Sequence, residues 1–206
     1  MIFFENFWRF KSKLLNKKKL KITNKINFGN NITNSFFLDK LKRSKFYFEY
    51  GSGSSTLAAN DFNKKFISIE LDKKYYFEVK KRIKNDQVKF FNIGPVGEFS
   101  YPILKLKKKI VSYINSIDIY FNNKDYPDLI LVDGRFRIAC CLNILRHVQK
   151  KSLKVLILLD DYEKRESYKI LNNFFKVRRI GRMAILSALK KKVSDKIYNE
   201  YLYDPR

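Results

Sequence analysis

The sequence predicts an α/β protein built on one mostly parallel sheet, with helices on both faces and an antiparallel hairpin at the C-terminal end. Short apolar segments alternate with longer amphipathic ones from residue 45 to residue 175, which indicates parallel strand–helix–strand units. Two more strand-like segments then follow each other directly across Gly181-Arg182, as in a tight hairpin. Five parallel strands and a final hairpin are therefore expected.

Three strands are expected in the first half of this region. The aromatic segment 45–50 ends at a glycine, as a buried strand does. Segments 65–71 and 88–93 have the same apolar character. The two stretches between these strands, at 56–62 and 73–84, are expected to be helices.

A long connection, residues 94–128, separates the third strand from the fourth. It is expected to contain a helix near 106–119 and to cover a ligand site, since long connections in compact domains are often lids. The remaining expected strands are 129–132, 154–159, 176–180 and 183–189, with helices near 138–149 and 165–175.

Three regions are expected along the chain: a basic, partly helical N-terminal extension (1–45), the α/β domain (46–189) and a polar C-terminal tail (190–206). The net charge is +24, and the first 45 residues carry +10 of it. This excess has two readings, a lysine-rich surface composition or a polyanionic partner such as nucleic acid or an anionic membrane surface. The charge alone does not separate them.

The composition excludes several classes of protein. With 45% hydrophobic and 16% aromatic residues, the chain is not a disordered basic tail. The only two cysteines, Cys140 and Cys141, are adjacent, which excludes a disulfide scaffold and suits a reducing cytoplasm. No apolar run reaches the roughly 20 residues of a membrane span, and the N-terminus does not resemble a secretory signal. A cytoplasmic location is expected.

In open α/β sheets, ligands bind at the carboxyl ends of the strands. The first strand carries Glu49 near its end and is followed by Gly51-Ser52-Gly53, where glycines allow a sharp turn and a close backbone approach to a ligand. The loop lacks the Gly-Lys-Ser/Thr ending of a phosphate-binding P-loop, and Thr56 stands where a dinucleotide-binding fingerprint has its third glycine. A plain strand–helix turn is the alternative.

Acidic residues also follow the second, fourth and fifth strands. Glu70 lies 21 residues after Glu49, at the spacing of a carboxylate that accepts hydrogen bonds from ribose hydroxyls. Asp133 follows the fourth strand, and Asp160 and Asp161 follow the fifth. For these three residues, capping of the next helix is the alternative to a functional role.

These motifs resemble those of class I S-adenosylmethionine-dependent methyltransferases. FEYGSGSST at 48–56 is similar to the family's first motif, an acidic residue before a Gly-x-Gly turn, and ISIE at 67–70 is similar to its ribose-binding motif. The resemblance covers residues 45–189 and implies a Rossmann-like sheet of seven strands. NIGPVGEFSYP and LILVDGRFRIACCL further resemble stretches of small bacterial methyltransferase-like proteins.

The resemblance implies that S-adenosylmethionine is the cofactor. It places Glu49 near the methionine portion and Glu70 at the ribose. The backbone of Gly51, Ser52 and Gly53 would pass close to the cofactor. Asn92 and Ile93, at the end of the third strand, would lie near the adenine; many members have an acidic residue there, whereas this sequence has none between Phe90 and Val96.

Some family members, including catechol-type O-methyltransferases, bind a divalent metal after the fourth and fifth strands. Asp133, Asp160 and Asp161 fall at comparable places, and three oxygen ligands suit Mg²⁺. A metal would lower the pKa of a bound acceptor hydroxyl. The alternatives are that Asp133 acts alone as a general base, or that Asp133 and Asp160 are structural.

Two arginines follow Asp133 in the chain. Arg135 and Arg137 lie beside the expected mouth of the site, where they could bind a carboxylate or phosphate of the acceptor. Ion pairs with Asp133 or with Glu163 and Glu166 are the alternative. The single histidine, His147, falls well inside a helix and is expected to be a partly buried helix residue.

The function expected from these observations is methyl transfer, most readily to an oxygen of a small-molecule or sugar-type acceptor, which can be anionic. Asp133 and Arg135 are the catalytic candidates. A nucleic-acid methyltransferase is a second hypothesis, which the charge favours. Against it, the sequence has no Asn-Pro-Pro-aromatic or Pro-Cys motif and no separate RNA-binding module. A methyltransferase-like protein that binds a ligand without catalysis is the third.

Overall fold

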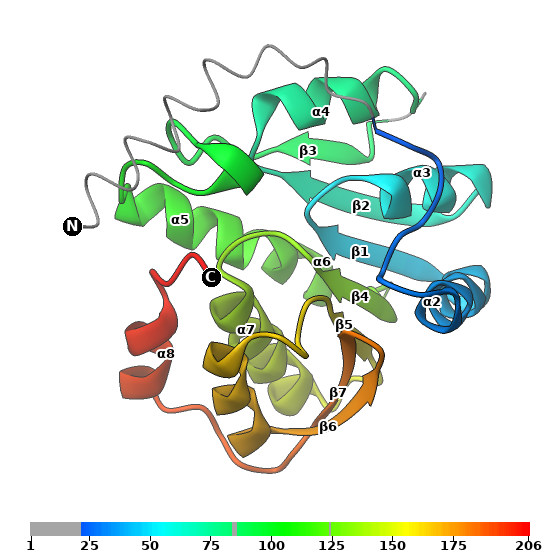
Figure 1. Ribbon diagram of the computed structural model, residues 1–206. Coiled ribbons are helices and arrows are strands. Elements are labelled where there is room, and N and C mark those ends of the chain that lie inside the picture. The colour runs from blue at the N-terminus through cyan, green and yellow to red at the C-terminus, as the bar shows by residue number, and fades with distance from the viewer. Residues whose placement is uncertain (1–21, 84–85, 124) are drawn as a thin grey trace.

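The computed structural model describes residues 22–83, 86–123 and 125–206. Its centre is a single seven-stranded sheet in the order β3-β2-β1-β4-β5-β7-β6 (Figure 1). The strands β1 to β5 are parallel, β7 runs antiparallel to β5, and β6 pairs antiparallel with β7. The predicted mostly parallel sheet with a C-terminal antiparallel hairpin is confirmed.

The strands form where the apolar segments were expected, although their ends differ. In the described residues they are β1 (Phe46–Tyr50), β2 (Lys65–Glu70), β3 (Val88–Phe90), β4 (Leu129–Val132), β5 (Leu156–Leu159), β6 (Phe175–Ile180) and β7 (Met183–Ala188). Every residue of β1 and β4 is buried, because helices cover both faces of the central strands.

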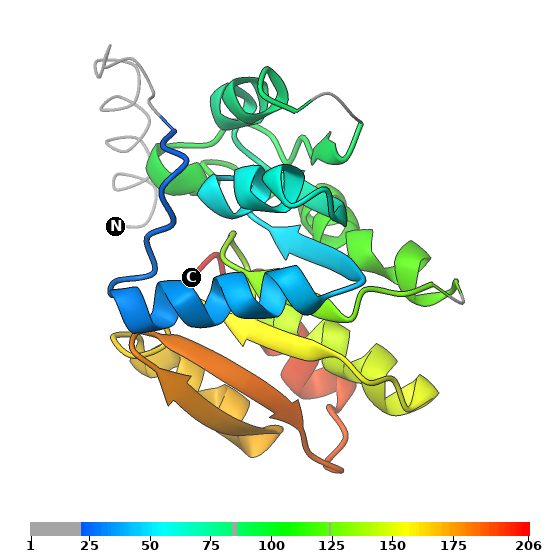
Figure 2. The same ribbon diagram turned by 90° about the vertical axis from the view of Figure 1, so that its right-hand side faces the viewer.

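The helices form two layers. On one face lie α2 (Asn31–Arg43), α3 (Ser54–Asp61) and α4 (Lys73–Lys80). On the other lie α5 (Lys107–Ile114), η2 (Asn115–Ile117), α6 (Asp118–Phe121), α7 (Arg137–Lys151), η3 (Glu166–Asn173) and α8 (Asp195–Tyr201). Figure 2 shows the first layer nearest the viewer, with α2 crossing in front of the sheet. A short 3₁₀ turn, η1 (Glu98–Ser100), lies in the long connection between β3 and β4.

Three elements are shorter or more broken than the sequence pattern predicted. The strand β3 ends at Phe90 instead of residue 93, since Gly94 has a positive φ of 101° and donates its N–H to the Asn92 side chain. The single helix expected near 106–119 is divided into α5, η2 and α6. The element after β5 is a 3₁₀ helix.

Both segments that flank the predicted α/β domain pack onto the sheet region. The helix α2 begins after Asn30, whose side chain accepts from the N–H of Thr33, and it buries Phe37 and Leu41. At the other end, α8 follows the cap Ser194 and buries Tyr198. The first 21 residues of the predicted basic extension lie outside the described residues. Every described helix is too short or too polar to cross a lipid bilayer.

Candidate functional site

A cavity of about 1000 Å³ opens at the carboxyl ends of β1, β2, β4 and β5. This is the edge of the sheet where a ligand site was expected. Its wall includes the glycine loop, the ends of the four strands, part of the connection 94–128 and an arginine of the C-terminal hairpin. The residues used below line it: Asn27, Phe28, Gly51, Ser52, Gly53, Glu70, Ser100, Tyr113, Asp133, Arg135, Arg137, Asp160, Asp161, Arg165, Arg182 and Arg206.

The two glycines of the loop have different roles. Gly51 has a φ of 95°, and a Cβ built there would lie 2.9 Å from the backbone nitrogen of Gly134. It therefore allows the loops after β1 and β4 to touch. A Cβ built at Gly53 would meet no atom within 4 Å, so Gly53 leaves open space beside the cavity. Of the two, only Gly53 keeps room for a ligand.

Glu49 lies beneath the glycine loop and does not line the cavity. It is fully buried, and its carboxylate accepts hydrogen bonds from the hydroxyls of Tyr47, Ser55 and Thr56. Burial raises the pKa of Glu49, while the three hydroxyls oppose the rise. Because Ser55 and Thr56 belong to the first turn of α3, Glu49 fixes that helix against β1 instead of facing a ligand.

Glu70 connects the end of β2 to the glycine loop. It accepts the N–H of Ser52 at 2.9 Å and those of Leu71 and Asp72 at 2.7 Å each, and it also lines the cavity. Burial raises its pKa to about 7, against the lowering effect of these hydrogen bonds. Its Oε2 has one donor in the structure, so it keeps a lone pair for a ligand hydroxyl.

The residues after β3 lie beside a second cavity of about 780 Å³. Asn92 lines this second cavity, together with Phe77 and Phe90. Ile93 is buried in the core. Leu71 and Asp72 line both cavities, so the two hollows adjoin next to Glu70. A flat apolar group bound in the second cavity would lie next to a polar group held by Glu70.

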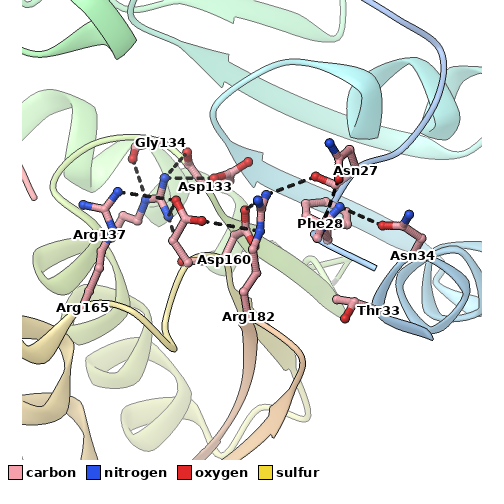
Figure 3. A network of polar contacts seen from close by, with 12 residues as sticks. Asn27, Phe28, Thr33, Asn34, Asp133, Gly134, Arg137, Asp160, Arg165 and Arg182 are labelled. Carbon is pink, nitrogen blue, oxygen red and sulfur yellow. Dashed lines mark hydrogen bonds and ion pairs between the residues drawn. The ribbon is translucent and has the colours of Figure 1, made fainter. Parts of the chain in front are cut away.

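Three arginines pair with the three aspartates after β4 and β5, as Figure 3 shows in part. Arg182, from the hairpin, donates to both oxygens of Asp160 at 2.9 and 2.7 Å. Arg137 lies 2.9 Å from an oxygen of Asp133 and 3.4 Å from one of Asp161. Arg165 lies 3.4 Å from Asp161. Asp161 itself has a φ of 58°, so it ends β5 in a sharp turn.

The three aspartates do come together, with one oxygen of each within 4.8 Å of the others. Arg137, Arg165 and Arg182 match their charge, and both Asp160 oxygens are already taken by Arg182. A divalent cation needs carboxylates whose lone pairs and charge are available. The donor set therefore does not fit a resident Mg²⁺, and the contacts support the structural alternative for Asp160.

Asp133 differs from the other two aspartates because among the described residues it pairs with one arginine at one oxygen, whereas Asp161 pairs with three arginines and Asp160 is held at both oxygens. A third of the Asp133 side chain is exposed, while Arg137 contacts its Oδ1 at 2.9 Å. Burial in the cavity wall raises its pKa; Arg137 opposes the rise, and Asp160 and Asp161 add to it. A carboxyl group with a raised pKa beside a ligand cavity is a good candidate for a general base.

The structure also separates the roles of the two arginines after Asp133. Arg137 is almost fully buried and donates to the carbonyls of Asp133, Gly134 and Asp160, so it joins the ends of β4 and β5. Arg135 lines the cavity without an ion pair to any described residue. The glutamates considered as its partners bind elsewhere, Glu163 to Arg179 and Glu166 to Lys169.

Sequence reasoning missed part of the wall. Asn27 and Phe28 line the cavity from the segment before α2, and Arg182 donates to the carbonyl of Asn27 at 3.1 Å. Arg206 lines it from the other end of the chain. No local pattern marks these residues, since each reaches the site through contacts distant in sequence. The one signal available was the Gly181-Arg182 turn, which places an arginine at the tip of the hairpin.

His147 and the cysteines lie away from the cavity. The Nε2 of His147 is 3.0 Å from Asp118, and its ring stacks on Phe121, which agrees with the expected helix residue. Cys140 and Cys141 are buried and free.

Comparison with known proteins supports the fold. No family model and no curated protein sequence matches the chain. Among solved structures, the chain is similar to a methyltransferase-like protein (spo2022) from Silicibacter pomeroyi DSS-3, with a TM-score of 0.70 and 23% identity over 83% of this chain and 93% of that one. At this identity the likeness concerns the fold: the α/β fold is shared with a methyltransferase-like protein.

Proposed function

We propose that this chain is an S-adenosylmethionine-dependent methyltransferase that acts on an oxygen of a small-molecule or sugar-type acceptor. The observation that carries the proposal is the position of Glu70. It is a buried carboxylate at the end of β2 that fixes the glycine loop through Ser52 and lines a cavity of about 1000 Å³. Ribose binds to a carboxylate at this place in dinucleotide-type α/β folds.

The residues present fit the cofactor. Glu70 offers a lone pair to the ribose hydroxyls, and Gly53 leaves open space beside the loop. The adjoining second cavity, lined in part by Phe77 and Phe90, suits the flat adenine. When bound, S-adenosylmethionine supplies a methyl group already activated by the sulfonium, so that alignment of the acceptor provides much of the catalysis.

Asp133 is the residue proposed to handle the proton of the acceptor hydroxyl. Its Oδ1 is held by Arg137, which leaves Oδ2 to accept that proton as the oxygen attacks. Burial brings the pKa of Asp133 up from its ordinary value, closer to neutral pH, where a general base works best.

Calorimetry with S-adenosylhomocysteine tests the cofactor assignment, with Gly53→Leu as the variant. The new side chain has room in the protein and would occupy space next to the loop. We expect affinity to fall at least about tenfold while the unfolding midpoint stays unchanged. The control is Ser187→Leu, an exposed position on β7. It follows Leu186, which pairs with Ile157 near the amino end of β5, so it lies at the end of the strands away from the cavity. Failure of the wild-type chain to bind at millimolar ligand would overturn the proposal.

A further inference from the structure

The cavity contains five arginines, and one of them lacks a partner. Arg137, Arg165 and Arg182 pair with the aspartates described above, and Arg206 lies 2.6 Å from Asp204. Arg135 has no ion pair with any described residue, and its Nε is buried without a hydrogen bond. The Arg135 side chain is only partly exposed, so its charge has lost part of its water without gaining an ion pair, which costs stability.

Two tyrosine hydroxyls near Arg135 are also buried without a well-aligned hydrogen-bond partner among the described residues. They belong to Tyr113 and Tyr168, which are fully buried, although the backbone N–H of Arg135 lies close enough to the Tyr113 hydroxyl to oppose the rise of its pKa caused by burial. Both tyrosines lie close enough to Arg135 to act on its charge. Tyr113 also lines the cavity, and a Cβ built at Gly134 would lie 2.4 Å from the Tyr113 hydroxyl. Besides the Nε of Arg135 itself, two of the other four buried unpartnered side-chain atoms in the described chain therefore belong to tyrosines that act on the Arg135 charge.

Such a group of donors is complementary to an anion. A guanidinium presents N–H groups in a fork that matches a carboxylate or a phosphate, and hydroxyls can donate to the same oxygens. Buried polar atoms are normally satisfied in folded proteins, and exceptions often indicate a missing ligand or a functional role. The charges of the other four arginines are matched by carboxylates, which leaves Arg135 as the cavity arginine without an ion pair among the described residues.

We propose that Arg135 binds a carboxylate or phosphate group of the acceptor, so that the acceptor is an anion; this inference rests on the proposed methyltransferase function. Arg135 stands two residues after Asp133, the proposed base. It would hold the charged end of an acceptor whose hydroxyl faces Asp133. The carboxylate of the cofactor's methionine portion has the same chemistry, and the test below separates the two sources.

The experiment compares Arg135→Met with Arg178→Met, an exposed arginine on β6. Calorimetry at constant ionic strength measures binding of inorganic phosphate, with and without saturating S-adenosylhomocysteine, and binding of S-adenosylhomocysteine alone. We expect Arg135→Met to weaken phosphate binding at least about tenfold, with S-adenosylhomocysteine affinity unchanged. The unfolding midpoint should stay the same or rise, because the variant removes a partly buried charge that has no ion pair among the described residues.

Three results would overturn the inference. One is equal phosphate affinity in the two variants, which would assign phosphate binding to the general surface charge. The second is a tenfold loss of S-adenosylhomocysteine affinity in Arg135→Met, which would assign the anion to the cofactor. The third is a lower unfolding midpoint in that variant, which would indicate a structural role. If the wild-type chain bound no S-adenosylhomocysteine, the proposed function would fail. Phosphate binding that was lost only in Arg135→Met would, even then, support an anion site at Arg135.

Discussion

At the scale of single residues, the protonation of Glu70 couples the binding site to the stability of the protein. The carboxyl group is almost fully buried, and burial raises its pKa from an ordinary 4.5 to about 7. Between these two pH values the folded chain keeps a proton on Glu70 that the unfolded chain has released. The free energy of unfolding must therefore fall as the pH rises through this window.

Glu70→Gln should remove this dependence. We expect the contribution of Glu70 to the free energy of unfolding to fall by up to about 1.4 kcal/mol per pH unit between roughly pH 4.5 and 7. Urea unfolding of wild type and variant at several pH values measures the slope of the unfolding free energy against pH. The difference between the two slopes is the contribution of Glu70. Asp133 acts in the same direction, so the variant should retain part of the slope. Equal slopes would contradict the prediction, and Glu200→Gln on the exposed surface of α8 is the control.

The sequence predicted which carboxylates gather at the cavity better than it predicted which way each one faces. Glu70 and Asp133 follow strands whose ends meet at one edge, and both line the cavity. Glu49 shares a face of β1 with Tyr47, because alternate residues of a strand point the same way, and that face lies under α3. Local pattern does not tell which face of a doubly covered strand is open to a ligand.

At the scale of elements, Arg182 connects three parts of the chain through hydrogen bonds and an ion pair. It comes from the hairpin, binds Asp160 at the end of β5, and donates to the carbonyl of Asn27 before α2 (Figure 3). The hairpin was predicted from the two strand-like segments across Gly181-Arg182. The contacts of Arg182 were not, because their partners lie 22 and 155 residues away and no local periodicity reports contacts at that separation.

Removal of Arg182 should therefore cost more stability than a surface ion pair would. Asp160 is 1% exposed, so Arg182→Ala leaves a buried carboxylate without its partner. We expect a loss of about 2 to 3 kcal/mol, below the range for a fully buried pair because a third of the Arg182 side chain is exposed. Urea unfolding measures it. The control is Arg179→Ala, whose pair with Glu163 is exposed and worth less than about 1 kcal/mol.

A second variant separates the charge effect from general disruption of the hairpin. Asp160→Asn combined with Arg182→Ala removes the uncompensated charge, so the double variant should be more stable than Arg182→Ala alone. If the double variant were no more stable than Arg182→Ala, the loss would come from the packing of the Arg182 side chain on Gly29 and not from the uncompensated charge.

At the scale of the whole molecule, the positive excess is spread over the surface, whereas basic and acidic side chains pair in the cavity. Exposed lysines and arginines occur on α2, α4, α5, β6 and the segment 190–192, without a single dominant location. Six carboxylates line the cavity, and arginines pair with the three that follow β4 and β5, Asp133, Asp160 and Asp161. Composition predicted the net charge of +24 but not this distribution, since the distribution depends on which strand ends meet in the fold.

This distribution predicts that RNA binds weakly and without use of the cavity. A surface of net charge +24 should attract a short single-stranded RNA at low salt. Such binding releases counterions, so affinity should fall at least about 100-fold between roughly 50 and 200 mM salt. Arg135→Met should bind this RNA as wild type does, because Arg135 is one charge among 44. Fluorescence anisotropy measures both quantities. Affinity that persisted at the higher salt and was lost in Arg135→Met would instead make a nucleic acid the anionic acceptor.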